Sequence, residues 1–197
     1  MKAEPTPSTG TASVGIDLGL QTCATTSSGD KLIGRNFRKH EKALGTAQRA
    51  GKKDRARAIH AKIKNVRRDE LHKFSTKLVA AHAAIFVGNL SSAKLVKTRM
   101  AKSALDAGLG MLKTMLDDKS RWAGIVFKVV DESYSTQTWS CCWWIPARSP
   151  KGRSGLGIRA WRCSYCGADH DRDVNAATVI LAAGHGRLAG GIPALSA

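Results

Sequence analysis

The sequence predicts an α/β fold in which helices flank a mixed sheet and a small metal-binding module precedes the last helix. Segments with the period-two alternation of strands are interleaved with segments whose apolar residues recur at helical spacing. A Cys-x-x-Cys-Gly knuckle, from Cys163 to Gly167, then interrupts the last part of the chain. A chain of 197 residues is long enough for one domain with a core and such an appendage.

The N-terminal part predicts a flexible tail and three strands. Residues 1–12 are polar and form the tail. Val14, Ile16 and Leu18 alternate with glycine and aspartate, which predicts a strand carrying Asp17 near its end. Residues 22–28 and 31–37 predict a hairpin around a Ser-Gly-Asp turn, so three strands form a meander.

The middle of the chain predicts two helical regions and two strands. Helical periodicity covers residues 41–82, where Gly51 is expected to divide it, and an apolar run at 84–88 predicts a buried strand. A second helix is expected over 99–122 and a further strand over 124–130. The predicted core positions of that second helix are Met100, Leu105, Leu109, Leu112, Met115 and Leu116.

The C-terminal part predicts an insert and a closing helix. A stretch rich in Ser, Pro and Gly at 146–157 separates two cysteine clusters, and a helix is expected over 171–183. A Gly- and Pro-bearing tail ends the chain.

The charge of the chain indicates a polyanionic partner. The net charge is +17 with a pI of about 10.1, which argues against an enzyme for neutral small molecules. Sixteen of the 32 Lys and Arg residues lie between Lys31 and Lys77, where only four acidic residues balance them. A solvated helix face is the alternative, and contact with a phosphate backbone is favoured over it. The candidate nucleic-acid-binding residues are Lys52, Lys53, Arg55, Arg57, Lys62, Lys64, Arg67 and Arg68.

Compartment signals favour a cytoplasmic protein. No apolar run reaches the roughly 18 residues of a membrane-spanning helix, so no membrane partner is expected. The N-terminus lacks the apolar segment of a secretory signal. Five cysteines, an odd number clustered late in the chain, favour metal ligation over disulfides.

The cysteines predict a metal site. Cys163 and Cys166 have the spacing of half a zinc ribbon, and Gly167 allows the knuckle to turn. Cys142 is the expected third ligand, and Cys141 is a candidate for the fourth through a distorted knuckle. His170 is a weaker candidate, and Cys141 and Cys142 could instead be buried thiols.

Two aspartates predict a second, harder metal site. Asp17 lies at the end of a glycine-flanked strand, and Asp173 lies in the first turn of the last helix. An ordinary capping role is an alternative for Asp173. Together they suggest the acidic cluster of a phosphodiesterase that uses two Mg²⁺ ions. Such a site requires at least three carboxylates.

Five motifs together resemble the TnpB family, the OrfB proteins of bacterial insertion sequences, which are related to type V CRISPR nucleases. The resemblance covers roughly residues 13–193. It implies an RNase H-like RuvC domain interrupted by a zinc-binding module, with RNA-guided, Mg²⁺-dependent DNA cleavage. Asp17 would match the first catalytic Asp of the family and Asp173 the last. The motifs are Val14-Gly-Ile-Asp17-Leu-Gly, Ser135-Thr-Gln-Thr138, Ser149-Pro-Lys-Gly-Arg, Cys163-x-x-Cys166-Gly and Asp171-Arg-Asp173-Val-Asn175-Ala-Ala.

The sequence departs from this family in three places. The large N-terminal region of the family is expected to be absent, which would make this chain a truncated form. The middle catalytic Glu of the family is Gly88 here, and we hypothesise that Glu132, which follows the next strand, reaches the same site. Trp139 replaces the first knuckle cysteine and Trp143 replaces the turn glycine, as expected for a decaying or non-cleaving copy.

These resemblances imply a division of the chain. A RuvC-like domain would cover residues 13–134, including the basic helical insert at 41–82, and would resume with the final helix at 169–190. The zinc-ribbon-like insert would cover 135–168, and residues 191–197 would form a tail.

Two functions therefore stay open from the sequence. The first is an RNA-guided DNA endonuclease, impaired or not, with Asp17, Asp173 and Glu132 as catalytic residues. The second is a nucleic-acid-binding relic or regulator on the same fold, without cleavage. A plain zinc-ribbon protein with a basic helix is disfavoured, because a ribbon does not require the Asp-Arg-Asp-x-Asn-Ala-Ala run.

Overall fold

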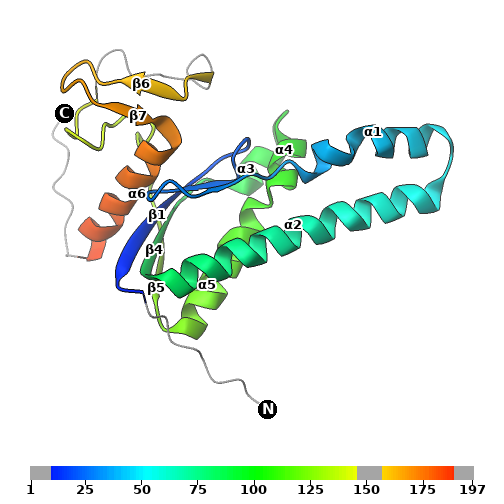
Figure 1. Ribbon diagram of the computed structural model, residues 1–197, viewed down its shortest axis with the longest axis horizontal. Helices are drawn as coiled ribbons and strands as arrows, with labels where there is room; N and C mark the ends of the chain where they lie inside the picture. Colours follow the sequence, from blue (N-terminus) through cyan, green and yellow to red (C-terminus); the bar gives the residue numbers. More distant parts are fainter. Residues whose placement is uncertain (1–9, 146–156, 189–197) are drawn as a thin grey trace.

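The computed structural model describes residues 10–145 and 157–188, which form a five-stranded sheet with helices on both faces (Figure 1). The predicted C-terminal tail, the Ser149 motif and most of the predicted N-terminal tail lie outside the described residues. Within the described ranges, no helix is both long and apolar enough to cross a membrane. The predicted α/β class with a mixed sheet is confirmed.

The sheet has the order β3-β2-β1-β4-β5. β1 pairs antiparallel with β2 and parallel with β4, and β4 pairs parallel with β5. The second hairpin strand is shorter than predicted, because the backbone leaves the sheet before Arg35, which adopts a left-handed conformation, and residues 36 and 37 are already helical. The strands are β1 (Ala12–Leu18), β2 (Ala24–Thr26), β3 (Lys31–Leu32), β4 (His82–Gly88) and β5 (Val126–Val130).

Two long helices, α1 (Asn36–Arg49) and α2 (Lys53–Ala81), and helix α5 (Leu109–Ala123) lie on one side of the sheet. α1 and α2 pack against each other, and Gly51 separates them as predicted. Figure 1 shows this pair extending well beyond the sheet. Apolar residues of α2 and α5, such as Leu71, Leu78 and Leu112, share a core with Val14 and Ile85 of the sheet.

The predicted helix over 99–122 is two helices. α4 (Ala101–Ala107) ends and α5 begins at Gly108, whose φ of 65° is left-handed and changes the direction of the chain. The apolar residues on the two sides of Gly108 therefore do not lie on one continuous helix face. Leu109, Leu112 and Leu116 are buried, but Met100 and Leu105 are exposed at 44% and 59%, so their prediction as core was wrong. A short helix, α3 (Ser92–Val96), precedes this pair.

α6 (Arg172–Leu188) covers the opposite face of the sheet and contacts β1, β4 and β5. A side chain on Gly15 would lie only 2.1 Å from the carbonyl of Ala177, and one on Gly184 would overlap the ring of Phe86. The two glycines therefore allow the helix to lie directly on the sheet.

A two-stranded hairpin precedes α6. β6 (Ala160–Arg162) pairs antiparallel with β7 (Asp169–Asp171), so residues 169–171 are a strand and not the beginning of the last helix. The helix begins at Arg172 because Asp171 accepts hydrogen bonds at Oδ1 from the backbone N–H groups of Asp173 (2.9 Å) and Val174 (3.1 Å).

Candidate active site and cysteine cluster

Three predicted carboxylates meet at one edge of the sheet. Val14 and Ile16 face the α2–α5 core, so alternation turns Gly15 and Asp17 towards α6. Asp17 is on β1 near its end, Glu132 lies two residues beyond β5, and Asp173 lies in the first turn of α6. All three line one cavity of about 420 Å³.

Glu132 occupies the space that a side chain at position 88 would fill. Gly88 pairs with Val130 in the β4–β5 register, and a Cβ atom on Gly88 would lie 2.1 Å from Oε2 of Glu132. The backbone N–H of Glu132 donates to Oδ1 of Asn89 at 3.4 Å, and Nδ2 of Asn89 donates to Asp131 at 3.2 Å. The glycine thus makes room for the carboxylate of a neighbouring segment.

The three carboxylates in this cavity repel one another, and the guanidinium groups of Arg172 and Arg159 offset part of that repulsion. Burial is the main cause that raises the pKa of Asp17 well above its usual 3.8, and the nearby Asp173 and Glu132 carboxylates raise it further. Burial also raises the pKa of Glu132, and its Oε2 is buried with no hydrogen-bond partner among the described residues. An orphaned carboxylate oxygen beside two further carboxylates fits a hard divalent cation, which takes oxygen ligands.

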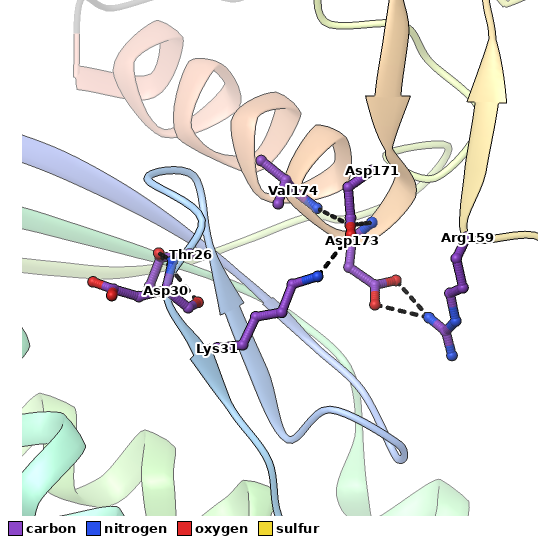
Figure 2. A network of polar contacts seen from close by, with 7 residues as sticks. All are labelled: Thr26, Asp30, Lys31, Arg159, Asp171, Asp173 and Val174. Carbon is purple, nitrogen blue, oxygen red and sulfur yellow. Dashed lines mark hydrogen bonds and ion pairs between the residues drawn. The ribbon is translucent and has the colours of Figure 1, made fainter.

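Arg159 is a site residue that the sequence reasoning missed. Its guanidinium Nη1 donates to both carboxylate oxygens of Asp173, at 2.7 and 2.8 Å, and Nη2 donates to Gln21 at 3.0 Å. Figure 2 shows this pair beside the ion pair between Lys31 and Asp171, at 2.6 Å. The only sequence signal for Arg159 is its position just before the knuckle.

Asp171, not Asp173, is the residue that caps α6. Its Oδ1 accepts the two backbone N–H groups of the first turn, while the Asp173 carboxylate turns towards Arg159 (Figure 2). The capping alternative for Asp173 is therefore wrong, and its carboxylate lines the cavity, where Arg159 holds it.

The four late cysteines form one cluster that could hold a metal ion. Their sulfur atoms all lie within 4.8 Å of one another, with Cys141 and Cys166 3.0 Å apart and Cys142 and Cys163 3.8 Å apart. Sulfurs about 2.3 Å from a tetrahedral ion are separated by roughly 3.8 Å, so the donor set fits. The adjacent pair Cys141–Cys142 supplies two of the four thiols, and Cys23 is buried elsewhere, where its thiol donates to Ala107 at 2.8 Å.

The two tryptophans that stand at the family's knuckle positions, Trp139 and Trp143, differ in burial and in backbone conformation. Trp139 is fully buried, and its ring lies 5.3 Å from that of His170, which is therefore a packing partner outside the cysteine cluster. Trp143 has a left-handed φ of 56° and is 48% exposed. The turn at 143 thus keeps the backbone conformation that suits glycine, although tryptophan occupies it.

The predicted basic residues follow α2 and its N-terminus. Lys52, Lys53, Arg55, Arg57, Lys62, Lys64 and Arg68 are exposed. Arg67 differs from them, because it is half-buried and its Nη1 donates to the carbonyl of Leu105 at 2.8 Å. Arg67 therefore helps to hold α4 against α2, and the other seven form an exposed basic surface.

Comparisons with known proteins agree with the resemblance. Residues 1–99 match the model of the family OrfB_IS605, described as "Probable transposase", and residues 110–180 match "Cas12f1-like, TNB domain". A "Putative RNA-guided DNA endonuclease" of Streptomyces pristinaespiralis is 35% identical over 91% of this chain and 47% of its own length. "Putative RNA-guided DNA endonuclease InsQ" of Escherichia coli is 30% identical over 90% of this chain and 50% of its own length. The chain thus spans about half the length of these relatives.

Two solved structures share the fold. A "Cas12f1-sgRNA-target DNA complex" contains a chain with a TM-score of 0.65 at 16% identity, covering 85% of this chain and 49% of that one. A "CRISPR-Cas12f Ternary Complex" gives a TM-score of 0.64 at 15% identity, covering 91% and 40%. The predicted mixed sheet flanked by helices is confirmed, and these two chains share its fold.

Proposed function

This chain belongs to the OrfB family of IS605 transposases, the TnpB-like proteins, and from that premise we propose that it is the nuclease part of an RNA-guided DNA endonuclease. The observation that carries the proposal is the convergence of Asp17, Glu132 and Asp173 in one cavity. DNA as substrate and RNA as guide follow the names of the relatives. A DNA substrate would place the protein at the bacterial nucleoid.

The three carboxylates would hold Mg²⁺. The bound ions would supply an activated water and stabilise the leaving oxygen of a phosphodiester. The protein itself gathers three anions at a partly buried site, and the free Oε2 of Glu132 offers a ligand atom. Arg159 holds the Asp173 carboxylate in one orientation until a cation reaches it.

The cysteine cluster would hold a structural Zn²⁺. Four thiols with no open position are typical of structural zinc and not of catalytic zinc. The cluster lies in the same segment as Arg159, so the ion would stiffen the module that contacts Asp173. The seven exposed basic residues of α2 and its N-terminus would contact nucleic-acid phosphates, so binding should weaken steeply as salt rises.

Nucleic-acid binding without cleavage is the second candidate. It is favoured by one observation, that Arg159 already neutralises Asp173 through two hydrogen bonds. A cation must compete with this guanidinium for the carboxylate.

A cleavage assay separates the two. We expect the full chain, purified with its bound RNA, to cut a matching DNA in Mg²⁺, and Asp17→Asn and Asp173→Asn to abolish cutting while nucleic-acid binding stays. Asp118→Asn, an exposed carboxylate outside the cavity, is the matched control. Binding by the wild type without any Mg²⁺-dependent cutting would support the second candidate instead.

A further inference from the structure

A second cavity adjoins the carboxylate cavity. It has a volume of about 370 Å³ and shares the walls formed by Leu20, Gln21 and Met100 with the site of Asp17 and Asp173. Gln21 lies at the junction, where its Oε1 accepts a hydrogen bond from Arg159 at 3.0 Å. The two cavities therefore have part of their lining in common.

Three cations line this second cavity, namely Arg35, Arg38 and Lys102. The single carboxylate in its wall, Asp106, is engaged, because it accepts the backbone N–H of Phe37 at 2.8 Å and so caps α1. The lining of this cavity is therefore positively charged, since three cations outnumber its one engaged carboxylate.

Two of these cations, Lys102 and Arg38, are held in place by neighbouring groups. Glu41 accepts a hydrogen bond from Lys102 at 2.5 Å and lies 3.9 Å from Arg38. The Lys102 ammonium also lies 4.2 Å from the centre of the Phe37 ring. A cation fixed in this way loses less conformational entropy when it binds an anion.

Arg35 adds a further observation. It has a left-handed backbone, with φ 66° and ψ 30°, which is costly for a residue other than glycine. Its guanidinium has no ion-pair partner in the part of the chain that the structure describes. A strained position that presents an unpaired guanidinium to a cavity fits a binding role.

We infer that this basic cavity binds a backbone phosphate of the strand whose neighbouring phosphodiester lies at the carboxylates. The inference rests on the proposed function for the identity of that strand. Arg35 and Arg38 would bind the phosphate oxygens, and the apolar wall of Leu20 and Met100 would contact the sugar. The site would then set how far the strand advances into the carboxylate cavity.

Binding can be tested without cleavage. A short fluorescent single-stranded DNA is titrated with the full chain in Ca²⁺, which is expected to support binding without turnover. We expect Arg35→Gln/Arg38→Gln to weaken binding about 5- to 20-fold and to lower the salt dependence by about two released ions. Arg121→Gln/Lys128→Gln, with the same change of charge on exposed residues outside both cavities, should change it by less than about twofold.

Position is tested by neutralising single phosphates of the strand as methylphosphonates. In the wild type, neutralising one or two particular linkages should weaken DNA binding. In the Arg35/Arg38 variant, neutralising the same linkages should have no effect. Equal losses in both proteins, or an Arg35/Arg38 variant that binds like its control, would overturn the inference. The same effect seen only with an RNA strand would overturn the assignment to the DNA substrate.

This binding test and the cleavage assay can fail separately. If the wild type does not cut DNA in Mg²⁺ but the linkage effect is found, the proposed nuclease function fails and the phosphate site stands. If it cuts DNA and the linkage effect is absent, the phosphate site fails and the nuclease function stands.

Discussion

Gly88 and Glu132 share one space at the end of the β4–β5 pair, so a side chain at position 88 would displace the Glu132 carboxylate from its present place. A Cβ atom on Gly88 would be 2.1 Å from Oε2 of Glu132. The position at which the family resemblance implies a catalytic Glu is thus filled by a carboxylate from 44 residues further along this chain. The loss at position 88 and the presence of Glu132 are therefore two parts of one arrangement.

The first prediction exchanges the two positions. Gly88→Glu alone should displace the Glu132 carboxylate and lower both the melting temperature and Mg²⁺ binding. Gly88→Glu/Glu132→Gly should restore both, since one carboxylate again fills the space. Gly88→Ala/Glu132→Gly, which fits but lacks the carboxylate, should bind Mg²⁺ about 10- to 100-fold more weakly, the range known for changes around metal sites. Calorimetric titration with Mg²⁺ measures this. Equal affinities in the two double variants would show that Glu132 is not a ligand.

The second prediction concerns the repulsion at Asp17. Because burial and two neighbouring carboxylates raise its pKa, ionisation of Asp17 opposes folding, and this destabilisation grows as the pH rises above 3.8. Asp17→Asn should therefore stabilise the metal-free protein at neutral pH by about 1 kcal/mol, or roughly 2–4 °C in melting temperature. Added Mg²⁺ should raise the melting temperature of the wild type and leave that of the variant unchanged. A variant that melts lower without metal would contradict the repulsion.

The third prediction concerns the strained knuckle. Trp143 adopts a left-handed φ of 56°, so Trp143→Gly should relieve about 1 kcal/mol of strain and tighten zinc binding about fivefold. Trp144→Gly is the matched control, because Trp144 is not among the residues with a positive φ. Its ring centre lies 6.3 Å from that of Tyr165, in a tilted arrangement. Competition with a chromophoric chelator measures the affinity, and equal tightening in both variants would argue against strain.

The fourth prediction is that restoring the family cysteine at position 139 damages the protein. Trp139 is fully buried against His170, and Cys141 already contributes a thiol to the cluster. Trp139→Cys should cost about 3–5 kcal/mol of stability through the cavity that it leaves, with no gain in zinc stoichiometry. Thermal denaturation and metal analysis measure the two effects. A stabilised variant would mean that the knuckle lacks a ligand.

The fifth prediction concerns a link between the two sites. The buried side chain of Asn175 donates to the carbonyl of Thr138 at 2.7 Å and accepts from the backbone N–H of Ser140 at 2.9 Å. Asn175→Ala leaves two backbone groups unsatisfied, at about 1–3 kcal/mol each, and should weaken zinc and Mg²⁺ binding together.

The control for this link is Thr178→Ala. It removes a hydroxyl that donates to Val174 on the same helix and does not touch the knuckle. Loss of stability in both variants, with metal binding unchanged, would reduce Asn175 to a packing role.

The sequence alone determined the class of fold, the family and most of the candidate ligands. These follow from local patterns, such as the alternation around Asp17, the spacing of Cys163 and Cys166, and the run that carries Asp173. The helical period also predicted the long basic pair of helices and its break at Gly51.

The tertiary structure decided which residues complete those sites. It placed Glu132 in the space of Gly88, Arg159 on Asp173 and Cys141 beside Cys166. It also turned Arg67 from a surface cation into a packing residue of α4. These relationships join residues far apart along the chain, and they depend on sheet register and on the close approach of α6, which no local pattern specifies.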